Sequence, residues 1–180
     1  MDTNKKSFNH KFETAYDVFQ FLLATIDDNI KKGGRAYAFV NHLVSPLFAS
    51  KKDIKVIKNI EKKARVFYVC KSDSPFDQIL AQFYQEFSSE VKLGIDSLGF
   101  DIDKNKDVYV IDSLVVTVKL PKDHVKDIDN LYFDTKSILS FNMMNYFKNF
   151  ADKKMDFEVE VVKNEDKAKK LRKIFESVFD

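Results

Sequence analysis

The stretch Val108–Leu120 has a strongly β-favouring composition, and its pattern of apolar residues changes phase in the middle. Tyr109 and Ile111 occupy odd positions, whereas Leu114, Val116, Val118 and Leu120 occupy even ones. Successive side chains of a strand point to opposite faces of a sheet, so one unbroken strand cannot satisfy both patterns. A bulge or a tight turn at Asp112-Ser113 resolves the conflict. The stretch interrupts any regular alternation of strand and helix, so the sequence favours an α+β fold over a doubly wound one.

Helical and alternating patterns predict the remaining elements. The expected helices are Ala15–Lys32, Asp53–Ala64, Pro75–Val91, Lys136–Ala151 and a final helix that begins after Asn164. The other expected strands are Ala36–Leu43, Arg65–Cys70 and Met155–Val161. Ala36–Leu43 is also compatible with a helix that runs to Val44. The best helix start is Ser74-Pro75-Phe76-Asp77, with a capping serine, a proline in the first turn and an acid near the positive end of the dipole.

These elements predict an α+β fold: a mixed, largely antiparallel sheet of four to five strands packed with about five helices. A three-layer α/β arrangement is the alternative. Residues 1–11 are polar and are predicted to be a flexible N-terminal tail, and residues 12–180 are predicted to form a single α+β domain.

The composition narrows the class of protein. No apolar run reaches the 18 to 20 residues of a membrane span, and the polar start contains no secretory signal. The single cysteine, Cys70, forms no intrachain disulfide, which fits a reducing compartment. We therefore expect a soluble, cytoplasmic protein with no membrane partner. Lysines far outnumber the three arginines, Arg35, Arg65 and Arg172, which is typical of an AT-rich genome.

No catalytic or cofactor motif is visible, so no cofactor is expected. The three histidines, His10, His42 and His124, lie at no metal-ligand spacing, and no glycine-rich phosphate loop occurs. Cys70 has no second cysteine two residues on, and a structural thiol is the favoured interpretation. An enzyme would need a site assembled by folding from residues such as Cys70, His42 and the acids.

One segment resembles an EF-hand calcium loop. Asp101, Asp103, Asn105 and Asp107 place oxygens at alternate positions, with Asp112 at the twelfth. A lysine replaces the glycine of the sharp turn, the twelfth residue is not glutamate, and a β-rich stretch follows. A polar hairpin connection is therefore the favoured interpretation, with a metal site as the alternative.

Two segments are rich in lysine. The segment Lys51–Arg65 has a net charge of +5, and Lys163–Lys173 has +4, whereas Ser72–Ser113 has −6. The candidate nucleic-acid or anion-binding residues are Lys51, Lys55, Lys58, Lys62, Lys167 and Lys170. A solvated helix face is the simpler interpretation of such a pattern, and a polyanion-binding surface is the functional one. The scarcity of arginine argues against base-specific recognition.

The expected helix Lys136–Ala151 is apolar around much of its circumference, so something besides the sheet should cover it. Phe141, Met144 and Phe147 are the candidate partner-binding residues. The leading functional hypothesis is therefore a non-catalytic protein–protein interaction or regulatory module, as a homo-oligomer or a subunit of a larger assembly. The alternative is a non-specific nucleic-acid-binding protein that uses its lysine-rich helix faces. The third hypothesis is an enzyme whose site is not visible in the sequence.

Overall fold

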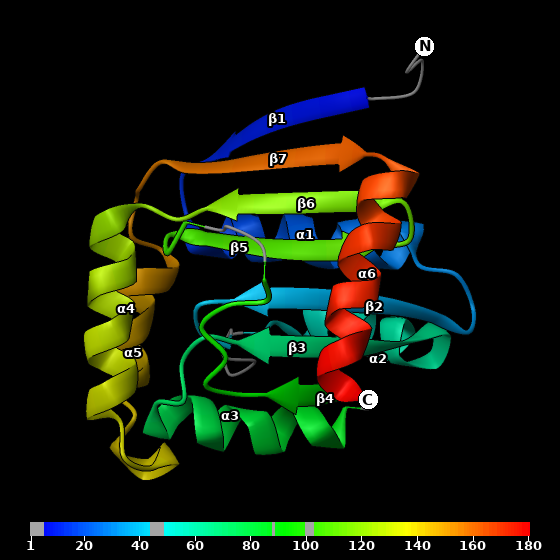
Figure 1. Ribbon diagram of the computed structural model, residues 1–180. Helices are drawn as coiled ribbons and strands as arrows, with labels where there is room; N and C mark the ends of the chain where they lie inside the picture. Colours follow the sequence, from blue (N-terminus) through cyan, green and yellow to red (C-terminus); the bar gives the residue numbers. More distant parts are fainter. Residues whose placement is uncertain (1–5, 44–48, 88, 100–102) are drawn as a thin grey trace.

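The centre of the molecule is a seven-stranded mixed sheet with the strand order β1-β7-β6-β5-β2-β3-β4 (Figure 1). The computed structural model describes residues 6–43, 49–87, 89–99 and 103–180. The strands are β1 Lys6–Phe12, β2 Gly34–Val40, β3 Ala64–Cys70, β4 Ser89–Lys92, β5 Lys106–Ile111, β6 Leu114–Lys119 and β7 Phe157–Lys163. The helices are α1 Ala15–Asn29, α2 Lys51–Lys63, α3 Pro75–Glu86, α4 Lys122–Asp134, α5 Met143–Tyr146 and α6 Glu165–Phe179.

The elements with strong local signals form where the sequence predicts them. Thr14, Ser74 and Asn164 cap α1, α3 and α6 by accepting a hydrogen bond from a backbone amide in the first turn. The phase change between β5 and β6 is a tight turn in which Asp112 has a φ of 51°. Ala36–Leu43 begins as a strand, β2, so the rival helix is excluded. The overall α+β character is as predicted.

The predicted sheet of four to five strands is wrong, because the sheet has seven. The missed strand β1 lies at an edge and pairs only with β7, and most of its described side chains are exposed, so its sequence is too polar to stand out from a tail. Residues 6–11, predicted to be flexible, therefore belong to the sheet. The missed strand β4 has four residues and pairs in parallel with β3. The predicted helix Pro75–Val91 extended over it, but α3 ends at Glu86.

The predicted helix Lys136–Ala151 is also not continuous. Helix α4, which we did not expect, ends at Asp134, and a 3₁₀ turn at Ile138–Ser140 follows. The short α5 then runs into a π-helical turn at Phe147–Ala151. The hydroxyl of Ser137 accepts a hydrogen bond from the backbone nitrogen of Ser140 and so caps the 3₁₀ turn. Such a local bond competes with a continuous α-helix.

Helices cover both faces of the sheet. Alternate residues of β2 show this division: Ala36 and Ala38 share a core with Leu22 of α1, whereas Tyr37 packs with Phe175 of α6. Ile60 of α2 belongs to the same core as α1, so α2 and α6 lie on opposite faces (Figure 1). Helices α4 and α5 lie beyond the carboxyl ends of β2 and β3. Among the described residues, no helix is long and apolar enough to cross a lipid bilayer.

Candidate functional site

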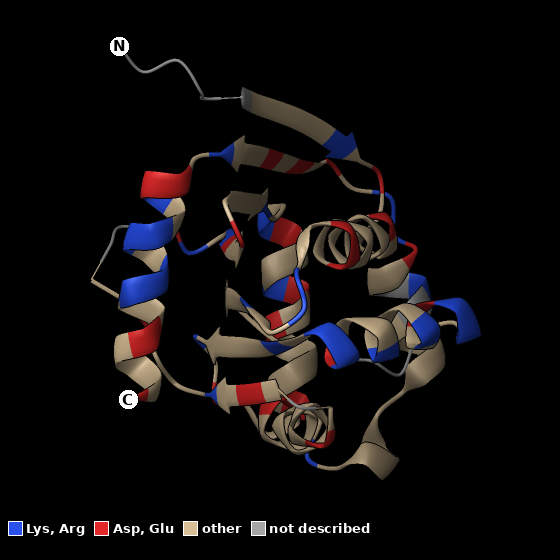
Figure 2. Cartoon of the chain, turned by 90° about the vertical axis from the view of Figure 1, so that its right-hand side faces the viewer, with Lys and Arg blue, Asp and Glu red and all other residues tan. Residues whose placement is uncertain are grey.

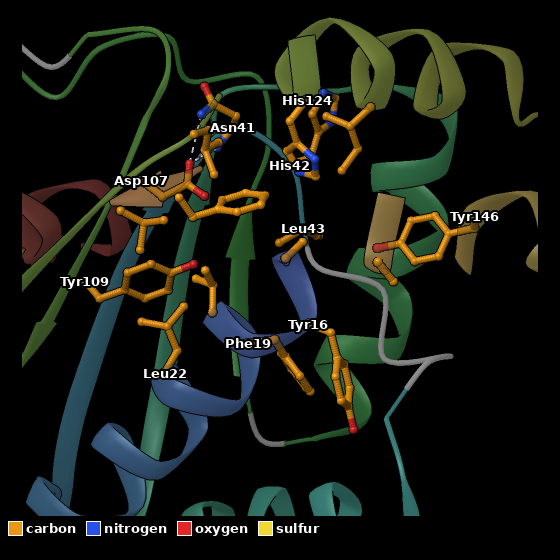
Figure 3. Close-up of a pocket in the computed structure, with 17 residues that line it drawn as sticks. Tyr16, Phe19, Leu22, Asn41, His42, Leu43, Asp107, Tyr109, His124 and Tyr146 are labelled. Carbon is orange, nitrogen blue, oxygen red and sulfur yellow. Dashed lines mark hydrogen bonds between the residues drawn. The ribbon is translucent and has the colours of Figure 1, made fainter. Parts of the chain in front are cut away.

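The carboxyl end of β2 opens onto a small, mostly apolar cavity that has a few polar side chains in its wall (Figure 3). Strands β2 and β3 are parallel and the neighbouring β5 is antiparallel, so the ends of the first two meet the beginning of the third. The chain leaves β2 as Asn41-His42-Leu43, and Asp107 lies near the start of β5. With residues of α1 and α4 they line a cavity of about 80 Å³. Carboxyl ends of parallel strands are a frequent location of ligand sites in α/β proteins.

Asp107 is a buried carboxyl group, 7% exposed, at this end of the sheet. Its Oδ1 accepts hydrogen bonds from the backbone nitrogen of Asn41 at 2.8 Å and from Asn41 Nδ2 at 2.9 Å. Burial raises the pKa of Asp107 to about 6, although these bonds act in the opposite direction. On the far side of the amide, Lys71 Nζ donates to Asn41 Oδ1 at 3.1 Å, and burial lowers the pKa of this ammonium group. The Asn41 side chain therefore bridges an acid and a base.

His42 is held between two carboxylates. Its Nδ1 lies 2.7 Å from Asp77 Oδ2 on α3, and its Nε2 lies 2.7 Å from Asp129 Oδ1 on α4. Burial opposes a charged ring, but the hydrogen bonds and charges of the two aspartates outweigh it and raise the pKa of His42. Both ring nitrogens donate when the ring is protonated, so neither is free to accept a proton from a substrate. His42 therefore fastens α3 and α4 to the end of β2.

His124 of α4 lines the same cavity. Its ring is 6% exposed and meets Phe157 edge-on at 5.1 Å, and its Nδ1 has no hydrogen-bond partner among the described residues. Burial lowers the pKa of His124 to about 4. One water occupies roughly 30 Å³ of liquid, so a cavity of about 80 Å³ has room for two or three. It is too small for a nucleotide or a sugar.

Cys70 lies beside the hydrogen-bonded residues Asn41 and Asp77, as an enzyme site assembled by folding would require. Its thiol is fully buried, 3.3 Å from the backbone oxygen of Asn41 and 3.7 Å from Asp77 Oδ1. Burial, and then the neighbouring carboxylate, raise the pKa of the Cys70 thiol. A buried thiol that resists ionisation next to a carboxylate is a poor nucleophile. The hydrogen bonds among Asn41, His42, Asp77 and Asp107 therefore stabilise this end of the sheet. Their geometry does not activate Cys70 as a nucleophile.

The residues of the calcium-loop pattern do not converge. Asp101 lies outside the described residues, and Asp103 is exposed and pairs with Lys106. The Asn105 side chain donates to a backbone carbonyl just after β6, and Asp107 faces the core. Within residues 6–43, 49–87, 89–99 and 103–180, no group of three or more His, Cys, Asp or Glu side chains is placed to hold a metal ion.

The lysines of α2 form a continuous exposed face. Lys51, Lys55, Lys58 and Lys62 are exposed, and none has a hydrogen bond or ion pair with a described residue. Ser50 and Asp53 close the start of this helix with a capping box. Asp53 also accepts hydrogen bonds from the Tyr16 hydroxyl at 3.1 Å and from Gln20 at 2.6 Å, which ties α2 to α1.

Neither acid of α2 is exposed, although Glu61 lies close enough to Lys58 to feel its charge. Asp53 is 2% exposed, and the Oε1 of Glu61 is buried. The exposed charged residues of α2 are therefore all lysines. We call the exposed lysines of this helix the α2 lysine face: Lys51, Lys52, Lys55, Lys58 and Lys62.

The lysines of α6 belong to a different surface. Lys167 and Lys170 are exposed, but α6 lies on the opposite face of the sheet from α2 (Figure 2). The first turn of α6 also exposes Glu165 and Asp166. The six predicted lysines are therefore all accessible, but the sheet separates them into two groups.

Two of the three predicted partner-binding residues, Phe141 and Met144, lie in different environments. Phe141 stacks on the buried ring of Phe76, with 4.5 Å between ring centres, so it belongs to the core. Met144 is 78% exposed, and the side chain of Phe147 lies outside the described residues. Their expected common face required a continuous helix, which the structure does not contain.

Comparisons with known proteins identify the fold. No protein-family model and no curated protein matches the sequence. NucT from Helicobacter pylori has a similar structure, with a TM-score of 0.52 and 14% identity over 96% of this chain and 95% of that one. Nuc from Salmonella typhimurium, a phospholipase D family member, has a TM-score of 0.51 and 11% identity over 96% and 93%. TrmBL2, an archaeal DNA-binding chromatin protein, is more distant, with a TM-score of 0.46, 9% identity and coverage of 95% and 51%. At these identities the likeness to the first two shows a shared fold and nothing finer.

Proposed function

We propose that this protein binds the phosphate backbone of nucleic acid, without reading the bases, through the α2 lysine face. The observation that carries the proposal is that all five exposed charges of this helix are positive and have no ion pair with a described residue, whereas Asp53 is buried and Glu61 is half-buried. The non-catalytic protein–protein hypothesis loses its basis, because it depended on the continuous apolar helix that the structure replaces with short turns.

The dimensions suit a phosphate backbone. Lys51 and Lys62 are separated by eleven residues, or about 16 Å along a helix that rises 1.5 Å per residue. Duplex DNA rises about 3.4 Å per nucleotide of each strand, so the face spans roughly five nucleotides. Each lysine that neutralises a phosphate releases condensed counterions, which favours binding entropically.

The arginines support binding without base recognition. Arg35 lies 3.6 Å from Glu176, Arg65 lies 3.5 Å from Glu90, and Arg172 lies 2.8 Å from Glu165. Direct readout of guanine most often uses an arginine that donates two parallel hydrogen bonds. All three arginines of this chain already face carboxylates, whereas the lysines of the α2 lysine face have no ion pair with a described residue.

The test is binding of a labelled 20-base-pair duplex and a 20-nucleotide single strand, both of arbitrary sequence, measured by fluorescence anisotropy. For four phosphate contacts, log K should fall with log salt with a slope of about −3.6 on the duplex. Lys55→Glu/Lys58→Glu/Lys62→Glu should reduce duplex affinity on the order of 10²-fold at 0.1 M salt, because it removes three contacts and adds repulsion.

The matched control is Lys167→Glu/Lys170→Glu/Lys173→Glu on α6, which changes the net charge by the same amount. We expect it to weaken binding by less than about threefold, through long-range electrostatics alone. Circular dichroism checks that both variants are folded. Equal losses in the two variants, or affinity that does not depend on salt, would show that the α2 lysine face is not the binding surface.

A further inference from the structure

A second cavity, much larger and mostly apolar, lies under α2. It has a volume of about 420 Å³, is partly open to solvent and is lined mainly by residues of α1, α2, β3 and α3. Its walls include Leu23 and Ile26 of α1, Ile57 of α2, Val66 of β3 and Phe83 of α3. Cavities of about 300 to 1,000 Å³ with apolar walls and few polar groups are typical of small-molecule sites.

Glu61 of α2 lines this cavity and has a buried oxygen atom. Its Oε1 is buried and has no hydrogen-bond partner among the described residues. Asp53, the other acid of the same helix, is buried and accepts hydrogen bonds from Tyr16, Gln20 and Ser50. A buried acceptor without a donor costs roughly 1 to 3 kcal/mol, so Glu61 is an unsatisfied group facing an apolar space.

We infer that this cavity binds a small, largely apolar molecule carrying a single hydrogen-bond donor, an alcohol or an amine, with the donor directed at Glu61. The apolar body would displace water from the walls, and the donor would satisfy the orphaned oxygen. Burial raises the pKa of Glu61, and the nearby charge of Lys58 only partly opposes this. A carboxylate ligand fits poorly, because it offers no donor at neutral pH and repels an ionised Glu61.

Lys58 lines this cavity and also belongs to the α2 lysine face, so the two sites adjoin. Binding of a small apolar molecule does not require nucleic acid, and it is measured separately. The probes are 1-decanol, decylamine and decanoate, which share a ten-carbon body and differ in the head group. Binding is measured by isothermal titration calorimetry on the full chain. We expect 1-decanol and decylamine to bind at least tenfold more tightly than decanoate.

Two substitutions test the location from opposite walls. Ile57→Trp on α2 and Leu23→Trp on α1 should each fill the cavity and weaken 1-decanol binding at least tenfold. Lys62→Trp is the matched control, because it places the same side chain on α2 outside the cavity, and it should bind 1-decanol as the wild type does. Glu61→Leu should keep the apolar contact but remove most of the preference for a donor head group.

Several results would overturn the inference. The wild type could fail to bind 1-decanol and decylamine up to their solubility limits. Binding could be unchanged in both cavity-filling variants, which circular dichroism must show to be folded. Decanoate could bind as tightly as 1-decanol, or Glu61→Leu could retain the full preference for the donor. The last two would show that Glu61 does not select the ligand.

Discussion

His42 and His124 are buried to the same degree, 6% exposed, and line the same cavity, yet their electrostatic states are opposite. The first has a carboxylate on each ring nitrogen and a raised pKa. The second has an unpartnered Nδ1 and a pKa lowered to about 4. Burial favours the neutral ring in both positions, so the partners alone decide the sign of the shift.

This difference assigns distinct structural roles to the two rings. His42, with its raised pKa, joins three elements, since β2 ends just before it and its aspartates come from α3 and α4. The neutral His124 behaves as a polar ring packed among apolar neighbours. The same substitution, histidine to leucine, should therefore have very different consequences at the two positions.

The largest effect is expected for His42→Leu. It leaves Asp77, whose side chain is 0% exposed, without its cationic partner. Removing one member of a buried ion pair typically costs about 3 to 5 kcal/mol. Urea denaturation at pH 6 should show a loss of that size in the free energy of unfolding. His10→Ala, at an exposed position, is the control, and a loss below about 1 kcal/mol for His42→Leu would contradict the ion-pair assignment.

Local signals explain how much of the fold the sequence predicted. The Ser74-Pro75 helix start and the turn at Asp112 depend on residues within a few positions of each other, and both were predicted correctly. Strand β1 was missed because it becomes a strand only by pairing with β7, about 150 residues away along the chain. The predicted continuous helix Lys136–Ala151 was wrong, because the apolar residues of this segment pack against α3 and α4 and do not form one stripe along a helix.

The site was harder to predict for the same reason. His42 meets Asp77 and Asp129, which are 35 and 87 residues away, so no local spacing reveals the pair. The accessibility of Lys55 and Lys58 was predictable, since helical periodicity places them opposite Ile60. Their separation from the lysines of α6 was not, because only the tertiary arrangement places the sheet between the two helices.

The second prediction concerns acid pH and His124. Its pKa is about 4 in the folded state and has an ordinary value of 6.5, so the unfolded chain binds this proton first. The neutral His124 therefore stabilises the folded state above pH 6.5, and this stabilisation is lost as the pH falls toward 4. The full loss is about 3 kcal/mol.

The control for this acid effect is His124→Leu, whose free energy of unfolding should change much less between pH 6.5 and 4.5 than that of the wild type. His42 does not contribute to the difference in this range, because its stabilisation is fully present below pH 6.5. Parallel curves for the wild type and His124→Leu would mean that His124 is solvated or paired.

A smaller effect is expected for Asp129→Asn. The Asp129 side chain is 48% exposed, so solvent screens its attraction to His42, and we expect a loss of only about 1 kcal/mol at pH 6. The substitution should also lower the raised pKa of His42, which NMR titration of the ring protons measures directly. The His42 contribution is lost as the pH rises through its folded-state pKa, so this loss should begin at a lower pH in Asp129→Asn. An unchanged His42 pKa would show that Asp77 alone holds the charge.

The smallest effect is expected for His124→Leu at pH 7, where both the folded and the unfolded chain carry a mostly neutral ring at this position. Leucine has a similar size, keeps an apolar contact with Phe157 and removes the unpartnered Nδ1. Replacing a buried polar atom that has no hydrogen bond with an apolar group is neutral or stabilising, so the free energy of unfolding should change by less than about 1 kcal/mol or increase. Urea denaturation of this variant beside His42→Leu gives the direct comparison. A loss above about 2 kcal/mol would show that Nδ1 is bonded in solution, and the contrast between the two histidines would then disappear.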